Sequence, residues 1–221
     1  MSDKSYDILK EYKNLKKCTD KYSDFYEKSQ GNYSVIQDLI DAANNILKSD
    51  LFSPDYKTLL KKSCENMING TMDMNTRLEK IKQFKVVVDS MKPEMTEALS
   101  LTCLSNIKHS FDEMYESIQQ SGFSDIAFNK FVEELNVYLF TDTKDAISLY
   151  NELKVPVLGL HQMYQKNKNI NPAVLQGCLD DIKKYLNGHI NFFQKQIGVN
   201  QSSKHDDWAD NILKQAITEK E

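Results

Sequence analysis

Residues that break helices are scarce in this chain. Its 221 residues include only seven glycines and four prolines. An all-β protein of this size needs many tight turns, and glycine and proline are among the residues that build them. Their scarcity therefore favours a helical fold over a β-sandwich or a barrel.

Arginine is nearly absent, because Arg77 is the only one among 28 basic residues. Lysine cannot reproduce the planar, two-pronged hydrogen bonding that arginine offers to phosphates and carboxylates. The formal net charge of −4 also gives no positive field that would attract a phosphate backbone. We therefore expect no sequence-specific binding of nucleic acid.

Long apolar runs are missing too. No stretch of 18 apolar residues occurs, so the sequence predicts no transmembrane segment. The N-terminal residues, MSDKSYDILK, lack the apolar core of a secretion signal. Two interpretations remain, an intracellular protein or a mature secreted chain whose signal has been removed.

The chain does contain apolar residues at intervals of three and four along almost its whole length, which is the helical pattern. This pattern predicts an all-α fold, a single compact bundle of about eight or nine helices with short connections. Capping residues and prolines mark several starts. The expected helices begin near Ser5, Ser34, Pro54, Met74, Pro93, Ser124, Thr143 and Pro172, and a short last helix surrounds Trp208.

The organisation along the chain is that of one helical domain over residues 1–221. No internal repeat of fixed period is present, so a solenoid is disfavoured. If the domain is subdivided, Gly122 is the best place for the boundary. The polar residues 200–203 predict a linker, after which a short C-terminal helix within 200–221 docks through Trp208.

The longest uninterrupted apolar stretch, residues 155–160, contains both Pro156 and Gly159. Pro156 removes the backbone hydrogen bond to Glu152 and predicts a kink in this helix. Gly159 permits the close approach of another backbone or of a ligand. The stretch is therefore either a kinked core helix or the wall of an apolar pocket. The pocket would be formed by Phe128, Phe131, Val157, Leu158, Gly159 and Leu160.

The four cysteines form no CxxC pair, which excludes a zinc ribbon or a thioredoxin-like motif. Each lies on the apolar face of a different expected helix. They are either buried free thiols or two disulfides that join helices in an oxidising compartment. The even count favours disulfides, in any of three pairings, among Cys18, Cys64, Cys103 and Cys178.

No constellation of residues predicts catalysis, a metal site or a cofactor. The four histidines are scattered over different helices without an HExxH motif, and the glycines are too far apart for a phosphate-binding loop. Adjacent acidic pairs such as Glu133-Glu134 point in different directions on a helix. Solvated faces explain them better than acid–base chemistry does.

Tyrosines are crowded near the N-terminus, and tyrosine is favoured at recognition surfaces. Tyr6, Tyr12, Tyr22 and Tyr26 are therefore candidates for protein contact, although their spacing also fits a buried helix stripe.

Together these patterns predict a non-enzymatic binding protein. The first hypothesis is a secreted helical bundle that binds or sequesters a partner protein through its helix faces. The second is a carrier of a hydrophobic small molecule or lipid between helices. The third is an intracellular scaffold or adaptor with free thiols. The disulfide interpretation favours an extracellular location over a cytoplasmic one.

Overall fold

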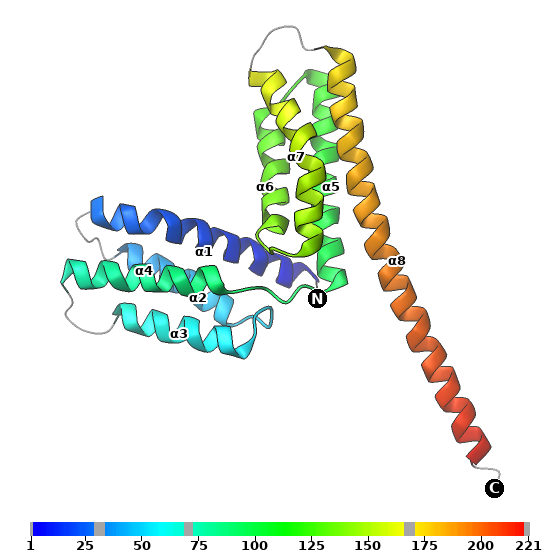
Figure 1. Ribbon diagram of the computed structural model, residues 1–221, viewed down its shortest axis with the longest axis horizontal. Coiled ribbons are helices and arrows are strands. Elements are labelled where there is room, and N and C mark those ends of the chain that lie inside the picture. The colour runs from blue at the N-terminus through cyan, green and yellow to red at the C-terminus, as the bar shows by residue number, and fades with distance from the viewer. Residues whose placement is uncertain (1, 29–33, 69–72, 166–170, 219–221) are drawn as a thin grey trace. The chain divides into compact units, whose positions relative to one another are not determined.

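The computed structural model confirms the all-α fold. It describes residues 2–28, 34–68, 73–165 and 171–218, and side chains within 4–21, 28, 36–68, 73–165 and 171–198. Over these ranges the chain forms eight helices and no strand (Figure 1). The helices are α1 (Ser2–Lys28), α2 (Ser34–Leu47), α3 (Pro54–Ile68), α4 (Met74–Ser90), α5 (Glu97–Ser121), α6 (Asp125–Leu139), α7 (Lys144–Gln165) and α8 (Pro172–Thr218).

Side-chain caps fix several helix starts where the sequence predicts them. The hydroxyl of Ser124 accepts a hydrogen bond of 3.3 Å from the backbone N–H of Ala127 at the start of α6. At the start of α8, Asn171 accepts one of 3.0 Å from the N–H of Ala173. Each cap satisfies an N–H group that has no partner within its own helix, which is why these residue types mark helix starts.

The start of α5 differs from the prediction. The helix begins at Glu97 rather than at Pro93, and its cap is Thr96, whose hydroxyl accepts from the N–H of Leu99 at 3.2 Å. The segment before it is held outside the helix by a tertiary hydrogen bond of 2.8 Å from the N–H of Glu94 to the carbonyl of Leu51. A long-range backbone contact of this kind leaves no trace in local sequence.

Helix α8 is continuous from Pro172 to Thr218, 47 residues in all. It runs through residues 200–203, where the sequence predicts a linker ahead of a separate short helix. These four residues are Asn, Gln, Ser and Ser, with neither proline nor glycine among them. Their helix propensities lie within about 0.7 kcal/mol of alanine per residue, so they weaken a helix without ending it.

Pro156 lies inside α7, which continues on both sides of it from Lys144 to Gln165. The proline ring is buried. Because proline has no N–H, the helix lacks one backbone bond at this point but does not stop. The kink expected here stays a prediction.

The chain divides into two compact units. The first contains residues 1–95 and 135–146, and the second contains 96–134 and 147–221. The first division thus falls after Met95, whereas Gly122 lies within the second unit, with a left-handed φ of 90° at the C-cap of α5. That conformation suits glycine because a side chain there would be strained. A single cooperative domain stays a prediction.

In the first unit, α1 packs against α2 and α4, and α3 also packs against both of them. Its core holds buried apolar side chains from all four helices, among them Leu9, Ile36, Leu60 and Phe84. Within each helix, the buried apolar residues recur at three- and four-residue spacing, so each helix contributes one apolar stripe.

The second unit is built from α5 and α8, which pack together, and from most of α6 and α7. The rings of Phe111 and Phe131 meet edge-on at 5.8 Å and join α5 to α6. The ring of Phe128 stacks on His161 at 5.4 Å and joins α6 to α7. Each ring pair thus couples neighbouring helices of this unit.

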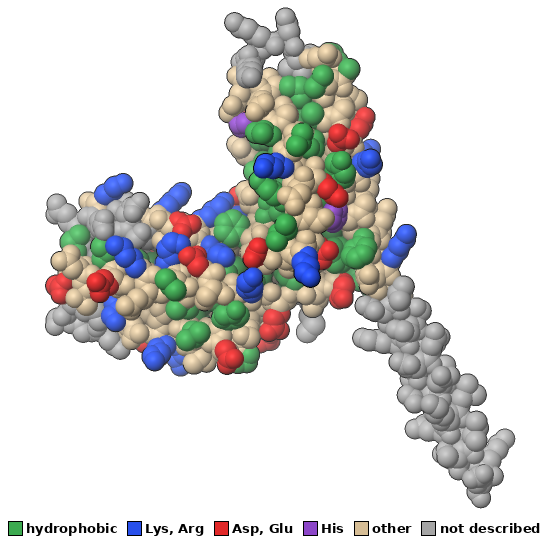
Figure 2. Space-filling model, viewed as in Figure 1, with side chains coloured by type: hydrophobic (Ala, Val, Ile, Leu, Met, Phe, Trp, Pro, Cys, Tyr) green, Lys and Arg blue, Asp and Glu red, His purple; other side chains and the backbone are tan. Residues whose placement is uncertain are grey.

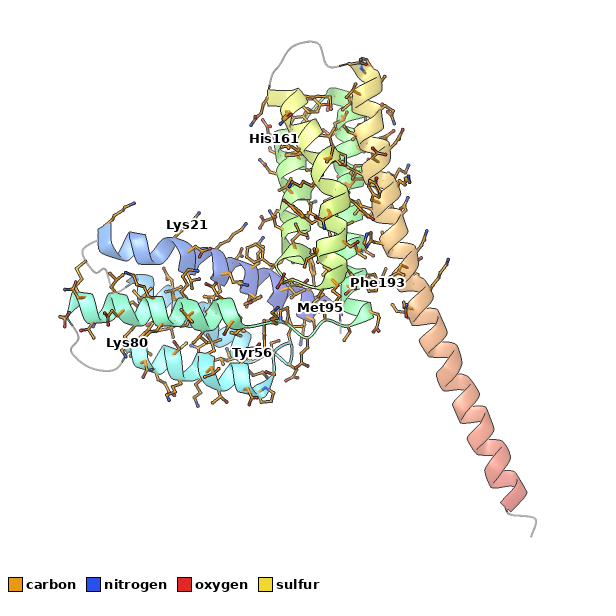
Figure 3. The ribbon with its side chains drawn as sticks, viewed as in Figure 1. Lys21, Tyr56, Lys80, Met95, His161 and Phe193 are labelled. Atoms are coloured by element: carbon orange, nitrogen blue, oxygen red, sulfur yellow. The ribbon has the colours of Figure 1, made fainter. Side chains whose placement is uncertain are left out.

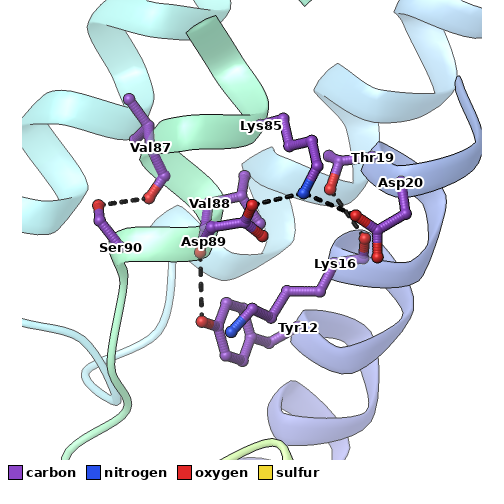
Figure 4. Close-up of polar contacts among 9 residues, drawn as sticks. All are labelled: Tyr12, Lys16, Thr19, Asp20, Lys85, Val87, Val88, Asp89 and Ser90. Atoms are coloured by element: carbon purple, nitrogen blue, oxygen red, sulfur yellow. Dashed lines mark hydrogen bonds and ion pairs between the residues drawn. The ribbon is translucent and has the colours of Figure 1, made fainter. Parts of the chain in front are cut away.

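A buried tyrosine closes the C-terminal end of α4. Tyr12 lies on α1, and its hydroxyl donates to the carbonyl of Met91 at 2.5 Å. It also lies 3.2 Å from the carbonyl of Val88 (Figure 4). Carbonyls at a helix C-terminus lack partners within the helix, so the Tyr12 hydroxyl supplies a hydrogen-bond donor that the helix lacks. Burial raises the pKa of Tyr12 well above its usual value, and the hydroxyl therefore keeps its proton.

Charged side chains add contacts between α1 and α4. The ammonium of Lys85 lies 2.6 Å from Asp20 and 2.5 Å from Asp89 (Figure 4). Within α1, the ammonium of Lys16 lies 5.2 Å from the centre of the Tyr12 ring. These contacts are partly solvated, so each contributes less than the buried hydroxyl does.

The substitution Tyr12→Phe tests this closure. It removes the donor and leaves a buried carbonyl unpaired, so the free energy of unfolding in urea should fall by about 1–3 kcal/mol. The control Tyr150→Phe alters a side chain that is 41% exposed, and its effect should stay within about 0.5 kcal/mol.

The same variant should also change the response to alkali. Because the pKa of Tyr12 is raised in the fold, its contribution to stability is complete below pH 10 and is lost as the pH rises further. Tyr12→Phe should flatten this alkaline loss. Equal slopes for the two proteins above pH 10 would contradict the burial of the Tyr12 hydroxyl.

Candidate interaction surface

The tyrosines expected to contact a partner are buried where the structure describes them. Tyr6 is 5% exposed and Tyr12 only 1%. The prediction of an exposed contact face is therefore wrong for these two residues, because both belong to the stripe that α1 buries. The side chains of Tyr22 and Tyr26 lie outside the described residues.

The predicted disulfides are absent, since all four cysteines carry free thiols. Cys64 and Cys103 are buried in the cores of different units, and Cys18 and Cys178 are partly exposed. Burial raises the pKa of Cys64 to about 11 and that of Cys103 to about 12. Protonated thiols in apolar surroundings are poor nucleophiles, so these two act as small core side chains.

Thiol titration tests this assignment. In denaturant without reductant, all four thiols should react with a disulfide reagent. In the native protein, Cys18 and Cys178 should react first, because the other two thiols are enclosed and protonated. The single variants Cys18→Ser and Cys64→Ser identify the phases. Fewer than four thiols in denaturant would restore the disulfide interpretation.

The six residues predicted to line an apolar pocket differ in burial, and the pocket stays a prediction. Phe128, Phe131 and Leu160 are buried in the core of the second unit. Val157 is half-buried, and Leu158 is 49% exposed. Within the run 155–160, Leu158 is exposed while Leu160 is buried, so a contiguous apolar run did not indicate a contiguous surface.

Gly159, the sixth of these residues, lies against another helix rather than a ligand. A Cβ atom added to it would lie 3.2 Å from the Sγ atom of Cys178 on α8. A contact this short is tighter than ordinary packing, so glycine is the residue that admits Cys178 here. The glycine thus serves the close approach of α7 and α8, which is the structural alternative left open by the sequence.

A double-mutant cycle tests this contact. Alanine suits a helix interior better than glycine by about 1 kcal/mol. In the background Cys178→Ala, the change Gly159→Ala should therefore stabilise the protein by about that amount. With Cys178 present, the tight contact should offset most of the gain or reverse it. Equal effects in both backgrounds, measured by thermal unfolding, would rule the contact out.

A second cluster of rings lies on α7 and the segments next to it in the second unit. The rings of Phe123 and Tyr164 stack with centres 3.7 Å apart, and His161 also contacts Gln165 at 2.6 Å (Figure 3 labels His161). Burial raises the pKa of Tyr164. These partly buried rings contact one another, so we interpret the cluster as packing between helices.

The solvent side of α7 carries an unexpected apolar stripe. Ile147, Tyr150, Val155 and Leu158 lie on the outward half of this helix, as two pairs three positions apart with five positions between the pairs. Their side chains are 47%, 41%, 75% and 49% exposed. Figure 2 shows apolar side chains of this kind at the surface among charged ones. We call these four residues the α7 stripe.

Other exposed apolar residues of the described chain are more dispersed. Val86 is 68% exposed on α4 and Ile126 is 84% exposed on α6, whereas Val174 and Phe192 are five turns apart on α8. Single exposed apolar residues are normal on soluble proteins, but a group along one helix side is typical of a binding surface. The α7 stripe is therefore the candidate interaction surface.

Charge within the stripe is of one sign. Lys154 is exposed, and its ammonium lies 5.9 Å from the centre of the Tyr150 ring. The nearby carboxylate of Glu152 points elsewhere, since it lies 3.0 Å from Nε2 of His189 on α8. The stripe thus presents apolar surface with a positive charge at its middle.

The sequence of α7 contains a signal for this surface in the spacing of its apolar residues. The apolar residues of α7 form two stripes. One contains Leu149, Leu153 and Leu160, and the other is the α7 stripe. The first is buried and the second exposed. A helix that is apolar on more than one side has more surface than one core can cover.

The described part of the chain contains neither a cluster of metal ligands nor a helix that could span a membrane. Within it, no three histidine, cysteine or acidic side chains gather that could hold a metal ion. None of its helices combines the length and apolar character needed to cross a bilayer.

Comparison with known proteins gives one similarity. The chain is 24% identical over 194 residues to the cGMP-specific 3',5'-cyclic phosphodiesterase gamma of Plasmodium yoelii. The match covers 75% of this chain but only 24% of that protein, so the chain spans about a quarter of its relative's length. No family model matches. No solved structure matches either.

Proposed function

We propose that this chain is a non-enzymatic binding protein that recognises a partner protein through the solvent face of α7. The observation that carries the proposal is the α7 stripe, in which four large apolar side chains are each at least 41% exposed along one helix side. Covering such surface on association releases water and stabilises the complex.

The similarity to about a quarter of a phosphodiesterase is compatible with this proposal. A segment corresponding to a quarter of a larger enzyme can bind other proteins or other parts of that enzyme. Enzymes that transfer phosphoryl groups commonly use clustered metal ligands. The described residues of this chain bring no such ligands together, so cyclic nucleotide hydrolysis is not part of the proposal.

The carrier hypothesis receives less support than protein binding. The space beside Gly159 is occupied by Cys178, and the other pocket candidates are either core residues or exposed. The argument for secretion depended on disulfides, and the thiols are free. We therefore extend the proposal to no small molecule and to no compartment.

Site-specific photo-crosslinking tests the proposal in the cells that make the protein. A photoreactive amino acid replaces Val155 in the stripe, and in a matched protein it replaces Val86, a similarly exposed valine on α4. Only the first should give one discrete protein adduct. With the purified partner, Leu158→Glu should then lower affinity at least about tenfold, because it places a charge in an apolar contact.

Two outcomes would contradict the proposal. One is the absence of any adduct from position 155 while the protein remains folded by circular dichroism. The other is the same set of adducts from positions 155 and 86, which would indicate non-specific contact.

A further inference from the structure

We infer that the partner of the α7 stripe is an amphipathic helix that carries an acidic residue beside its apolar face. This inference rests on the proposed function, because it uses the same surface and specifies what covers it. It is carried by the spacing of the exposed residues and by the charge of Lys154.

The spacing of the stripe fits a helix laid along α7. From Ile147 to Leu158 the stripe covers three helical turns, about 16 Å at 1.5 Å per residue. Tyr150, Lys154 and Leu158 form a ridge at four-residue spacing on α7, and ridges of this kind fit the grooves of another helix. The partner would thus add one helix to the outside of the second unit.

Apart from the carbonyl of Glu152, which Pro156 leaves without its helical bond, the side of α7 has no run of unpaired backbone groups. An extended peptide could therefore not add to α7 as a strand adds to a sheet edge. The contact must then come from side chains. A partner helix would place its own apolar residues at i, i+3 or i+4 and i+7 against Tyr150, Val155 and Leu158.

The positive charge of Lys154 favours a partner that carries a negative charge. Lys154 lies between Tyr150 and Val155 in sequence and on the same side of α7, and it is exposed. The carboxylate of Glu152 contacts His189 and therefore does not neutralise the charge of Lys154. A partner carboxylate opposite Lys154 would gain an ion pair at the edge of an apolar contact, where a basic partner would be repelled.

The same charge argues against a second copy of this chain as the occupant. If two α7 stripes met face to face about a two-fold axis at their middle, each Lys154 would lie near its counterpart. Two lysines close together at an apolar contact oppose association. A different chain with acidic character therefore fits better.

Two synthetic peptides test the inference on the full-length protein. Both are amphipathic helices of about 18 residues with the same leucine face, and they differ only in the flanking charges, glutamate in one and lysine in the other. Binding is followed by fluorescence anisotropy. The acidic peptide should bind about fivefold more tightly, the size expected for one exposed ion pair, and the preference should shrink as salt rises.

Substitutions locate the effect. Lys154→Glu should reverse the preference so that the basic peptide binds more tightly, while the fold remains intact by circular dichroism. Val155→Glu should weaken both peptides at least tenfold. The control Ile126→Glu, at an apolar residue on α6 that is 84% exposed, should change neither affinity.

The possible failures separate this inference from the proposed function. Equal binding of the two peptides, or a preference unaffected by Lys154→Glu, would overturn the acidic-helix inference, while an adduct from position 155 would still support a protein partner. A wild-type dimer that Val155→Glu dissociates in sedimentation would overturn both, because a second copy would then cover the stripe.

Discussion

A helix that is apolar on one side is stable in water only when that side is covered, and this constraint organises both units of the protein. In the first unit, α1 to α4 cover one another's stripes. In the second, α5 to α8 do the same through ring pairs and close helix approach. Helix α7 obeys the constraint for one stripe, through Leu149, Leu153 and Leu160, and leaves the other in solvent. The candidate function follows from that difference.

The fold could be predicted from the sequence because its signals are local. Capping at Ser124 and Asn171 needs only residues within three positions, and apolar periodicity needs only one helix. At the start of α5, Pro93 and Thr96 are both local start signals. The bond between Glu94 and Leu51, which are far apart in sequence, holds the segment after Pro93 outside the helix, so that α5 begins after Thr96. The break predicted in α8 at residues 200–203 is not observed, because polar residues alone do not end a helix.

The candidate site was harder to predict because sequence gives the sides of a helix but not which side is covered. Tyr12 fits a recognition surface by composition and a core by spacing, and only its carbonyl partners decide between them. Leu158 and Leu160 are two residues apart in an apolar run, yet one is exposed and the other fully buried. The same ambiguity applied to the cysteines, whose helix positions allowed either pairing or burial.

The close approach of Gly159 to Cys178 has a consequence for how this protein can change over evolution. The two positions share one small volume between α7 and α8, so a larger side chain at one position requires a smaller side chain at the other. A lineage that acquires a methyl group at position 159 can keep the helix spacing only by reducing the side chain at 178. These two positions should therefore covary among relatives, even though they lie far apart in the chain and neither belongs to the exposed face of α7.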